Sequence, residues 1–337
     1  INFAGIWTVA STNSLVAYNE VYGMKGGGAN DGMAFDADGF SSTTVTDGDV
    51  FEYNYSHDNN GGFMLFMRQA KNIIVRYNVS VNDVGTTGQK KLFLIEPSSN
   101  TSRYVYNNVF YLKNPVAKVF WMSAAGNFYN YILYRTSTIT SLSNVAITNN
   151  TIFSNNCFYP ADKFSALNWG SAVMNNNFYS DPSFVNPVSG NGFSTANGYN
   201  VSNTSDCRNG GILVNNNGGL DFVGNSLPLG NPDVGAFQHA VISQAGSNLA
   251  DAHVRDGSYA GHNYGAQASL EVKADVLHYA RKAYIKFDLS QVNLSNVSKA
   301  TLSLYGGTST ASIVRNISVY TTSTKNWAEN TLKLMDA

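Results

Sequence analysis

A pair of carboxyl groups stands out at Asp36 and Asp38, which lie two residues apart in the apolar alternation MAFDAD. On a β-strand, side chains two residues apart point to the same face, about 7 Å from one another. Glu96 ends a similar alternation, KLFLIE. Glycoside hydrolysis requires one protonated and one ionised carboxyl, roughly 6.5–9.5 Å apart in inverting enzymes and roughly 5–5.5 Å apart in retaining ones. These residues are therefore candidates for an inverting glycosidase; the alternative is that the two aspartates cap turns or bind a structural Ca²⁺ ion.

A second set of candidates, His57, Asp58 and Arg68, suits a lyase. β-Elimination from a uronic acid requires a group that neutralises the carboxylate, a base for the C5 proton and an acid for the leaving oxygen. Arg68 is the expected neutraliser and His57 the expected proton carrier, although a lone histidine is also common as a turn residue that hydrogen-bonds to backbone. The further candidates are Tyr55 as a proton carrier, Lys71 as a neutraliser, and Lys90 and Lys91 as substrate clamps.

The composition predicts an all-β protein. Charged residues make up only 13% of the 337 residues, whereas Gly, Tyr and Phe number 30, 20 and 19. Asparagine and glycine supply turns, while the Glu, Lys, Ala and Leu runs of long helices are scarce. The net charge of −1 argues against a global attraction to nucleic acid or membrane, and no apolar run approaches the roughly 20 residues of a membrane span. Cys157 and Cys207 are compatible with one disulfide or with two buried thiols.

A short phrase containing asparagine recurs along the first half of the chain, flanked by Val, Ile, Phe and Tyr. Its asparagines are Asn19, Asn54, Asn78, Asn107, Asn150 and Asn176. The shorter intervals suit one coil of a parallel β-helix with three short strands, and the longer ones predict loop insertions at 26–30 and 123–138. In stacked coils, we expect asparagine at one turn position to adopt the left-handed conformation and to hydrogen-bond to its copies above and below.

Four apolar segments become successive rungs of one sheet if the coils stack. They are MAFDAD (33–38), FMLFMR (63–68), KLFLIE (91–96) and KVFWMS (118–123). Adjacent rungs lie about 4.8 Å apart, so we expect Asp38 and Arg68 to be neighbours and Glu96 to lie one rung further. A slip of one residue in the register would turn these side chains inward.

The character of the sequence changes at Asp181, where the repeated phrase gives way to DPSFVNP and later to NSLPLGNPDVGAFQ, which ends at Gln238. Together with the coils and the phrase YNYSHDN followed by Gly-Gly-Phe, these segments make residues 1 to about 240 resemble secreted right-handed parallel β-helix proteins that act on polysaccharides. The resemblance implies an extracellular protein of that fold, and the group contains both hydrolases and lyases. The adjacent Asp-Asp of polygalacturonase-type hydrolases and the Arg-x-Pro-x-x-Arg phrase of pectate lyases are absent from this sequence.

Residues 241–337 resemble a DNRLRE-type domain, a β-sandwich related to carbohydrate-binding modules. The matching segments are Asp251–Arg255, Asn263–Gly265, Leu270–Lys273, Arg281–Leu289 and Trp327–Glu329. Because such domains run several strands further, the resemblance implies that this one is cut short at Ala337. Its basic cluster includes Arg255 and Arg281, which the resemblance assigns to binding acidic sugars; a solvated face of the sandwich is the alternative.

The sequence thus predicts an all-β chain, with a right-handed parallel β-helix over residues 1–240 and an incomplete, jelly-roll-like β-sandwich over 241–337. For function we favour an extracellular glycoside hydrolase that uses Asp36 and Asp38, with Asp58 or Glu96 as partner. A lyase acting on acidic glycans and a non-catalytic structural or adhesive β-helix, which would self-associate, are the alternatives. The expected partner is a polysaccharide or a cell-surface glycan, and no cofactor is expected beyond the possible Ca²⁺. Because INFAGIWTVA already reads as a strand, we expect the chain to be part of a longer protein.

Overall fold

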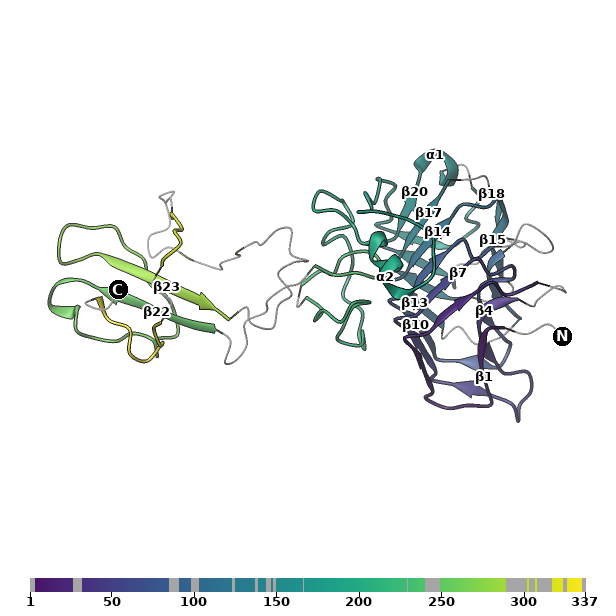
Figure 1. Ribbon diagram of the computed structural model, residues 1–337, viewed down its shortest axis with the longest axis horizontal. Coiled ribbons are helices and arrows are strands. Elements are labelled where there is room, and N and C mark those ends of the chain that lie inside the picture. The colour runs from purple at the N-terminus through teal and green to yellow at the C-terminus, as the bar shows by residue number, and fades with distance from the viewer. Residues whose placement is uncertain are drawn as a thin grey trace. The chain divides into compact units, whose positions relative to one another are not determined.

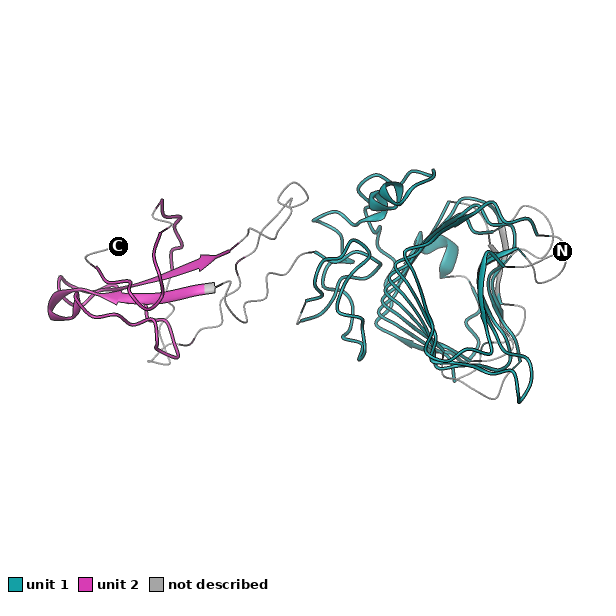
Figure 2. Cartoon of the chain, turned by 60° about the horizontal axis from the view of Figure 1, so that its bottom comes forward, with its two compact units in different colours: residues 1–241 teal, residues 242–337 magenta. Residues whose placement is uncertain are grey.

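The structure is a computed structural model in which the chain divides into two compact units, residues 1–241 (unit 1) and 242–337 (unit 2), coloured separately in Figure 2. The regular structure is nearly all β, which confirms the predicted fold class. The structure describes residues 4–26, 32–84, 91–97, 103–122, 125–136, 139–143, 147, 150–165, 167–228, 230–239, 249–288, 302, 307, 317–323 and 326–334.

Unit 1 is built from three parallel sheets (Figure 1). Sheet 1 contains, in spatial order, β1 (Ile6–Val9), β4 (Met33–Asp38), β8 (Gly62–Phe66), β12 (Lys91–Ile95), β15 (Val116–Met122) and β18 (Ile139–Ser143). Sheet 2 contains β2 (Leu15–Ala17), β6 (Val50–Glu52), β10 (Ile73–Arg76), β13 (Arg103–Tyr106), β16 (Asn127–Tyr129), β19 (Ile152–Ser154) and β21 (Val173–Asn175). Sheet 3 contains β3 (Glu20–Tyr22), β7 (Tyr55–His57), β11 (Val79–Val81), β14 (Val109–Leu112), β17 (Ile132–Arg135) and β20 (Cys157–Tyr159). A smaller pair, β5 (Thr46–Asp47) and β9 (Ala70–Lys71), lies in the turns.

The three sheets form a parallel β-solenoid of about five turns, because each full coil supplies one strand to each sheet. The stacked coils superpose in Figure 2. In sheet 1 the register pairs Phe35 with Met64, Met64 with Phe93, and Phe93 with Phe120. The four segments predicted as rungs are therefore neighbouring strands, β4, β8, β12 and β15, as expected from their alternation.

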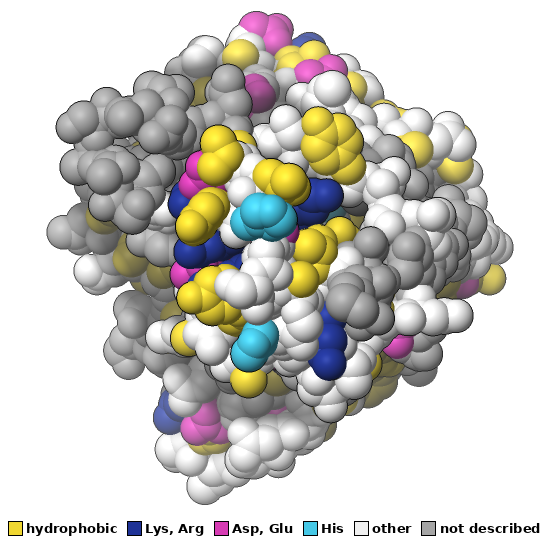
Figure 3. Space-filling view, turned by 90° about the vertical axis from the view of Figure 1, so that its left-hand side faces the viewer, with side chains coloured by type: hydrophobic (Ala, Val, Ile, Leu, Met, Phe, Trp, Pro, Cys, Tyr) yellow, Lys and Arg dark blue, Asp and Glu magenta, His cyan; other side chains and the backbone are white. Residues whose placement is uncertain are grey.

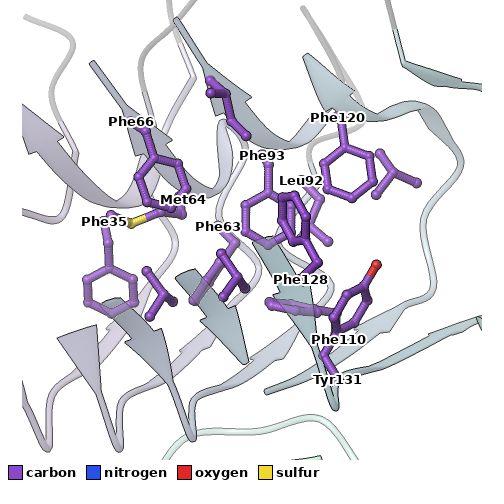
Figure 4. Packing of buried hydrophobic residues seen from close by; sticks show 14 of the residues in the cluster. Phe35, Phe63, Met64, Phe66, Leu92, Phe93, Phe110, Phe120, Phe128 and Tyr131 are labelled. Atoms are coloured by element: carbon purple, nitrogen blue, oxygen red, sulfur yellow. The ribbon is translucent and has the colours of Figure 1, made fainter. Parts of the chain in front are cut away.

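Aromatic side chains fill the interior of the solenoid. Phe35, Phe63 and Phe93 are fully buried or nearly so, and their rings meet edge to face at centroid distances of 5.6 and 5.8 Å. Figure 4 shows these rings directed toward the space between the sheets. Pairs of this geometry add about 0.5–1.5 kcal/mol beyond the burial of their area. In the last coil the ring of Trp169 lies 4.8 Å from that of Phe158 and closes this end of the core.

A ladder of asparagine side chains joins the coils at the turn between sheets 2 and 3. Asn54 donates to Oδ1 of Asn78 through its backbone N–H and its Nδ2, at 2.9 and 3.0 Å. The same two bonds link Asn19 to Asn54 and Asn78 to Asn108. Nδ2 of Asn78 also donates to the carbonyl of Phe51 at 3.0 Å. The buried amides are thus satisfied by the coils on both sides, which fixes the register of the stack.

The residue before each ladder position carries the left-handed conformation. Its φ is +58° at Tyr18, +54° at Tyr53 and +50° at Tyr77. The three rings stack on one another, with centroids 5.2 and 5.9 Å apart, which offsets part of the strain of an aromatic residue at positive φ. The prediction that one asparagine both bends the turn and forms the ladder is therefore wrong, since adjacent residues share the two tasks.

Adjacent asparagines hide this division of tasks in the sequence. Asn107 has φ +52° while its neighbour Asn108 holds the ladder position. Asn176 and Asn177 divide the tasks in the same way, with φ +49° at Asn176 and a bond from Asn156 to Oδ1 of Asn177. The predicted markers Asn107 and Asn176 are consequently one residue early.

The coil that contains β16 and β17 lacks the repeated asparagine. β16 and β17 lie within residues 123–138, where the sequence predicts a loop insertion, so that prediction is wrong. The cause is Tyr131, which occupies the ladder position of this coil and donates its backbone N–H to Oδ1 of Asn156 at 3.0 Å. Asn150, the predicted marker, is an exposed turn residue. Of the insertion predicted at 26–30, residues 27–30 lie outside the described residues.

Residues 181–239, here called the wrapping segment, run back over the outer faces of sheets 2 and 3. Its short helical turns are α2 (Phe193–Ala196) and η1 (Asn197–Tyr199). On sheet 2, Oη of Tyr106 donates to the carbonyl of Asn216 at 2.8 Å. On sheet 3, Oη of Tyr55 donates to the carbonyl of Gly190 at 2.8 Å. Side-chain contacts of this kind, rather than strand pairing, hold the segment against the coils.

Asp83 is a fully buried carboxyl in the turn after β11. Its oxygens accept hydrogen bonds from Oγ of Ser80 at 2.6 Å, from Nδ2 and the backbone N–H of Asn59 at 2.8 and 3.2 Å, and from Oγ of Ser56. Burial nevertheless raises the pKa of Asp83 to about 6, because the hydrogen bonds offset only part of the cost of desolvating its charge.

The raised pKa of Asp83 predicts that unit 1 loses stability as the pH rises from about 4 to about 6. Between these values the folded protein holds a proton that the unfolded chain releases, so its free energy of unfolding falls with pH, by on the order of 2–3 kcal/mol. Urea unfolding at half-unit pH steps measures this slope. The variant Asp83→Asn should flatten the dependence of the free energy of unfolding on pH. The control Asp162→Asn, at an exposed aspartate, should leave that dependence unchanged. An identical slope in wild type and Asp83→Asn would contradict the prediction.

Unit 2 contains the antiparallel pair β22 (Leu249–Arg255) and β23 (Arg281–Phe287). Ala252, Val254 and Leu332 form its buried cluster, and Trp327 packs against that cluster. A two-stranded sheet with one apolar face is consistent with the predicted β-sandwich. Within the described residues of unit 2, β22 and β23 form the one sheet.

Candidate functional site

The outer face of sheet 1 carries Asp36 and Asp38, as the alternation predicts. Phe35 and Ala37 are completely buried inside the solenoid, whereas both aspartates are partly exposed. Asp36 lies level with Leu65 of β8. The backbone of β4 therefore presents two carboxyls on one side of one strand, about 7 Å apart.

Asp38 and Glu96 stand in one row across the strands, with Met67 between them. The backbone N–H of Met67 donates to the carbonyl of Ala37 at 3.1 Å, and that of Glu96 donates to the carbonyl of Phe66 at 2.9 Å. These bonds continue the parallel register one residue beyond the strands. The row spans two rung spacings, about 9.6 Å between Cα positions.

The two carboxyls of this row lie in different environments. Oδ1 of Asp38 is buried without a hydrogen-bond partner among the described residues, and desolvation together with the charge of Glu96 raises the pKa of Asp38. Glu96 instead pairs with Arg68, whose Nη2 lies 3.2 Å from Oε2. Arg68 thus neighbours Glu96, and Met67 takes the place predicted for it beside Asp38. One desolvated and one ion-paired carboxyl form the arrangement by which a site separates a proton donor from an ionised partner.

The neighbouring row on the outer face, level with Asp36, is largely apolar. Leu65 and Leu94 point outward yet are only 6% and 3% exposed. Trp121 of β15 lies level with Leu94, and Nζ of Lys118 lies 4.6 Å from the centre of its ring. Trp7 of β1 lies level with Asp36 and is 45% exposed. Ligand sites typically combine apolar side chains with a few polar groups. Sequence reasoning missed Trp7 and Lys118, although the outward position of Trp7 in the alternation IWTV was a usable signal.

His57 belongs to a different face. It lies on β7 of sheet 3, is 2% exposed, and its ring stacks on that of Tyr22 at 4.9 Å. Its Nε2 lies 3.2 Å from Oε1 of Glu20, and its Nδ1 lies 3.0 Å from Oδ2 of Asp58. Oε1 of Glu20 also accepts the backbone N–H of Gly192 in the wrapping segment at 2.6 Å. Glu20, which pairs with His57, thus joins this face to the wrapping segment, and the structure does not bring His57 and Asp58 to Arg68.

The remaining sequence-derived candidates of unit 1 also lie away from the carboxyl row. Tyr55 is fully buried and bonded to the wrapping segment, and burial raises its pKa. Lys91 begins β12 with 1% exposure, so its side chain is not presented to a ligand. Lys71 lies on β9 in a turn, and Lys90 lies outside the described residues.

Arg255 and Arg281, the two candidates of unit 2, do come together. They face each other across β22 and β23, and both donate to Oε2 of Glu271, with Nη2 of Arg255 at 2.8 Å. The guanidinium of Arg255 lies 4.6 Å from the ring centre of Tyr264, on which His253 stacks at 4.7 Å. Burial lowers the pKa of His253; the charge of Glu271 opposes this and the two arginines reinforce it. The cluster is cationic and includes an aromatic ring, and Figure 3 shows basic and histidine side chains beside hydrophobic ones.

Two kinds of feature are absent from the part of the chain that the structure describes. There, no group of three or more His, Cys, Asp or Glu side chains is arranged to hold a metal ion, so the possible structural Ca²⁺ stays a prediction. No helix in these described residues has the length and apolarity needed to cross a membrane.

Comparison with known families gives one match. Residues 244–334 match the family described as carbohydrate-binding module family 96. No curated protein matches the chain. The match supports a carbohydrate-related function and covers unit 2 without extending to the solenoid.

Proposed function

We propose that unit 1 is a glycoside hydrolase whose reaction takes place on the outer face of sheet 1. The observation that carries the proposal is the unequal pair Asp38 and Glu96, the first desolvated with a raised pKa and the second paired with Arg68. Glycoside hydrolysis requires a proton donor and a second carboxyl that acts as a base, and the desolvation of Asp38 and the ion pair of Glu96 make these two carboxyls unequal in that sense.

In this mechanism Asp38 protonates the glycosidic oxygen as the bond to the leaving sugar breaks. Glu96 accepts a proton from a water molecule that attacks the anomeric carbon from the opposite side. The Cα positions of Asp38 and Glu96 are two rungs apart, about 9.6 Å, which is nearer to the wide carboxyl spacing of inverting enzymes than to the roughly 5–5.5 Å of retaining ones and so favours inversion of the anomeric centre. Arg68 is a positioning residue that orients Glu96, and Asp36 flanks the donor on the same strand.

The lyase alternative has less support from this geometry. A lyase would need a proton carrier beside the cation that neutralises the uronate. Arg68 is already paired with Glu96 on sheet 1, and His57 lies on sheet 3 between Glu20 and Asp58. The non-catalytic alternative assigns no role to the unequal carboxyls Asp38 and Glu96 on one outer face.

Product chemistry tests the proposal. The protein is incubated with neutral and acidic polysaccharides, and reducing ends and ultraviolet absorbance are read together. A hydrolase releases reducing ends alone, with inverted configuration by NMR at early times, whereas a lyase adds an absorbing unsaturated sugar. Reducing ends without absorbance support the proposal; absorbance, or no product across the panel, would reject it.

We also propose that unit 2 holds the protein on an acidic glycan outside the cell. The cationic cluster around Arg255 and Arg281 has one carboxylate, Glu271, for two guanidinium groups. The family match supports glycan binding by this unit. A guanidinium group binds a sugar carboxylate through paired N–H donors, and Tyr264 offers a ring beside it.

Arg281→Gln is expected to weaken binding to an acidic polysaccharide about tenfold, because one charge-assisted hydrogen bond is worth roughly 1.5–3 kcal/mol. Affinity electrophoresis at low and high salt measures the effect, which should shrink as salt increases. Lys282→Gln is the matched control, since Lys282 is the exposed next residue of β23 and points to the other face. Equal losses in both variants would show a diffuse charge effect and contradict a specific site.

A further inference from the structure

Two thiols lie at the contact between the last coil and the wrapping segment. Cys157 begins β20, and Cys207 lies in the wrapping segment. Both are free and buried, with 0% and 1% exposure. They belong to one apolar cluster of the sheet 3 face, which also contains Val201 and Val234.

The backbone on both sides holds these sulfurs in place. The N–H of Cys157 donates to the carbonyl of Tyr131 at 2.9 Å, and the N–H of Val234 donates to the carbonyl of Cys207 at 2.8 Å. Sγ of Cys157 lies 3.2 Å from the carbonyl of Ser180, and its thiol also hydrogen-bonds to that of Cys207. The two thiols thus lie near one another within one buried cluster, which is the proximity that a disulfide requires.

The surroundings argue against a catalytic thiol. The contact with Cys207 and burial raise the pKa of Cys157, whereas a reactive cysteine is exposed and has its pKa lowered by a nearby cation. A buried pair in mutual contact instead suits a structural disulfide.

We propose that Cys157 and Cys207 form a disulfide that fastens the wrapping segment to the last coil when the chain folds under oxidising conditions. Each thiol loses a proton, the two sulfurs form one bond, and the two electrons pass to a small disulfide such as oxidised glutathione, which becomes two thiols. The bond closes a loop that contains β21, α2 and η1. This inference does not depend on the hydrolase proposed for sheet 1.

The disulfide would matter because the wrapping segment has so little strand pairing to hold it. Side-chain hydrogen bonds join it to the coils on both sides of Cys207, from Tyr55 to Gly190 and from Tyr106 and Arg76 to Asn216. A covalent tie at Cys207 restricts the unfolded chain, and the gain grows with the length of the closed loop. Because both sulfurs are buried, the disulfide should resist reductants until the segment opens.

The full chain is refolded from denaturant with a mixture of reduced and oxidised glutathione, and compared with protein kept in reductant. We expect a mass lower by about 2 Da, no titratable thiol in denaturant, and an unfolding midpoint of unit 1 higher by roughly 5–15 °C. Cys157→Ala with Cys207→Ala keeps the apolar surroundings and should make the midpoint independent of redox conditions. Two free thiols after oxidative refolding, glutathione adducts on either cysteine, or an internal bond that leaves the midpoint unchanged would each overturn the proposal.

Discussion

Asp38→Asn is expected to lower the rate of polysaccharide hydrolysis by roughly 10²–10⁴-fold, because the leaving oxygen then departs without a proton donor. The loss should be smaller for an aryl glycoside whose leaving group is acidic enough to depart unprotonated. Comparison of the two substrates therefore separates loss of the acid from loss of the fold. The outward position of Asp38 and its unpaired, buried Oδ1 motivate this expectation.

The pH dependence follows from the same residue. The acid must be protonated to act, so the rate should fall as the pH rises through the pKa of Asp38, which desolvation and Glu96 place above the ordinary value of 3.8. This falling limb should disappear in Asp38→Asn when the aryl glycoside is used. Glu96→Gln should also lose activity. Added azide should then restore turnover and give a glycosyl azide whose anomeric configuration is opposite to that of the substrate, because azide replaces the water that Glu96 activates.

A matched control separates these effects from a general loss of negative charge. Asp206 is an exposed aspartate of the wrapping segment, away from sheet 1, and Asp206→Asn should retain full activity. If Asp38→Asn hydrolyses polysaccharide as fast as the control does, Asp38 is not the acid. If both substrates lose rate equally, the acid role is also rejected, even where the site itself is essential.

Asn78→Ala is expected to destabilise unit 1 by about 3–5 kcal/mol, because removing one partner leaves several buried groups unsatisfied. Oδ1 of Asn78 accepts both donors of Asn54, and its Nδ2 reaches Phe51 and Asn108. Each of these partners is buried, so none can turn to water instead. The change is measured as a shift in the urea midpoint of unit 1.

Asn215→Ala gives the reference for loss of an asparagine outside the ladder. Asn215 is exposed in the wrapping segment, and its replacement should change stability by less than about 0.5 kcal/mol. Asn78→Asp retains the acceptor but places a buried carboxylate oxygen against the carbonyl of Phe51 and Oδ1 of Asn108, so near neutral pH it should be at least as destabilising as Asn78→Ala. Equal stability of Asn78→Ala and Asn215→Ala would show that the ladder does not hold the coils together.

The sequence alone determined the solenoid and its main sheet. Alternating apolar residues in MAFDAD, KLFLIE and their neighbours dictate which side chains are buried on a strand, and a repeat too short to form its own core must stack. Asp36 and Asp38 could be placed on one outer face for the same reason. The sequence placed Arg255 and Arg281 in one basic cluster, and the pairing of β22 with β23 brings these two side chains opposite each other; their role in binding stays a prediction.

Only the tertiary structure decided the features that depend on contacts between distant segments. Tyr131 in a ladder of asparagines concealed one coil, since the ladder needs only a backbone N–H there. The placement of Met67 rather than Arg68 beside Asp38 is a one-residue choice of register, which local pattern does not fix beyond a strand end. His57 lies away from the carboxyl row because its strand, β7, belongs to sheet 3, and its partner Glu20 is bonded to Gly192 of the wrapping segment, which is distant in sequence. Burial and charge environment, which set the pKa of Asp38, arise from neighbours that only folding brings together.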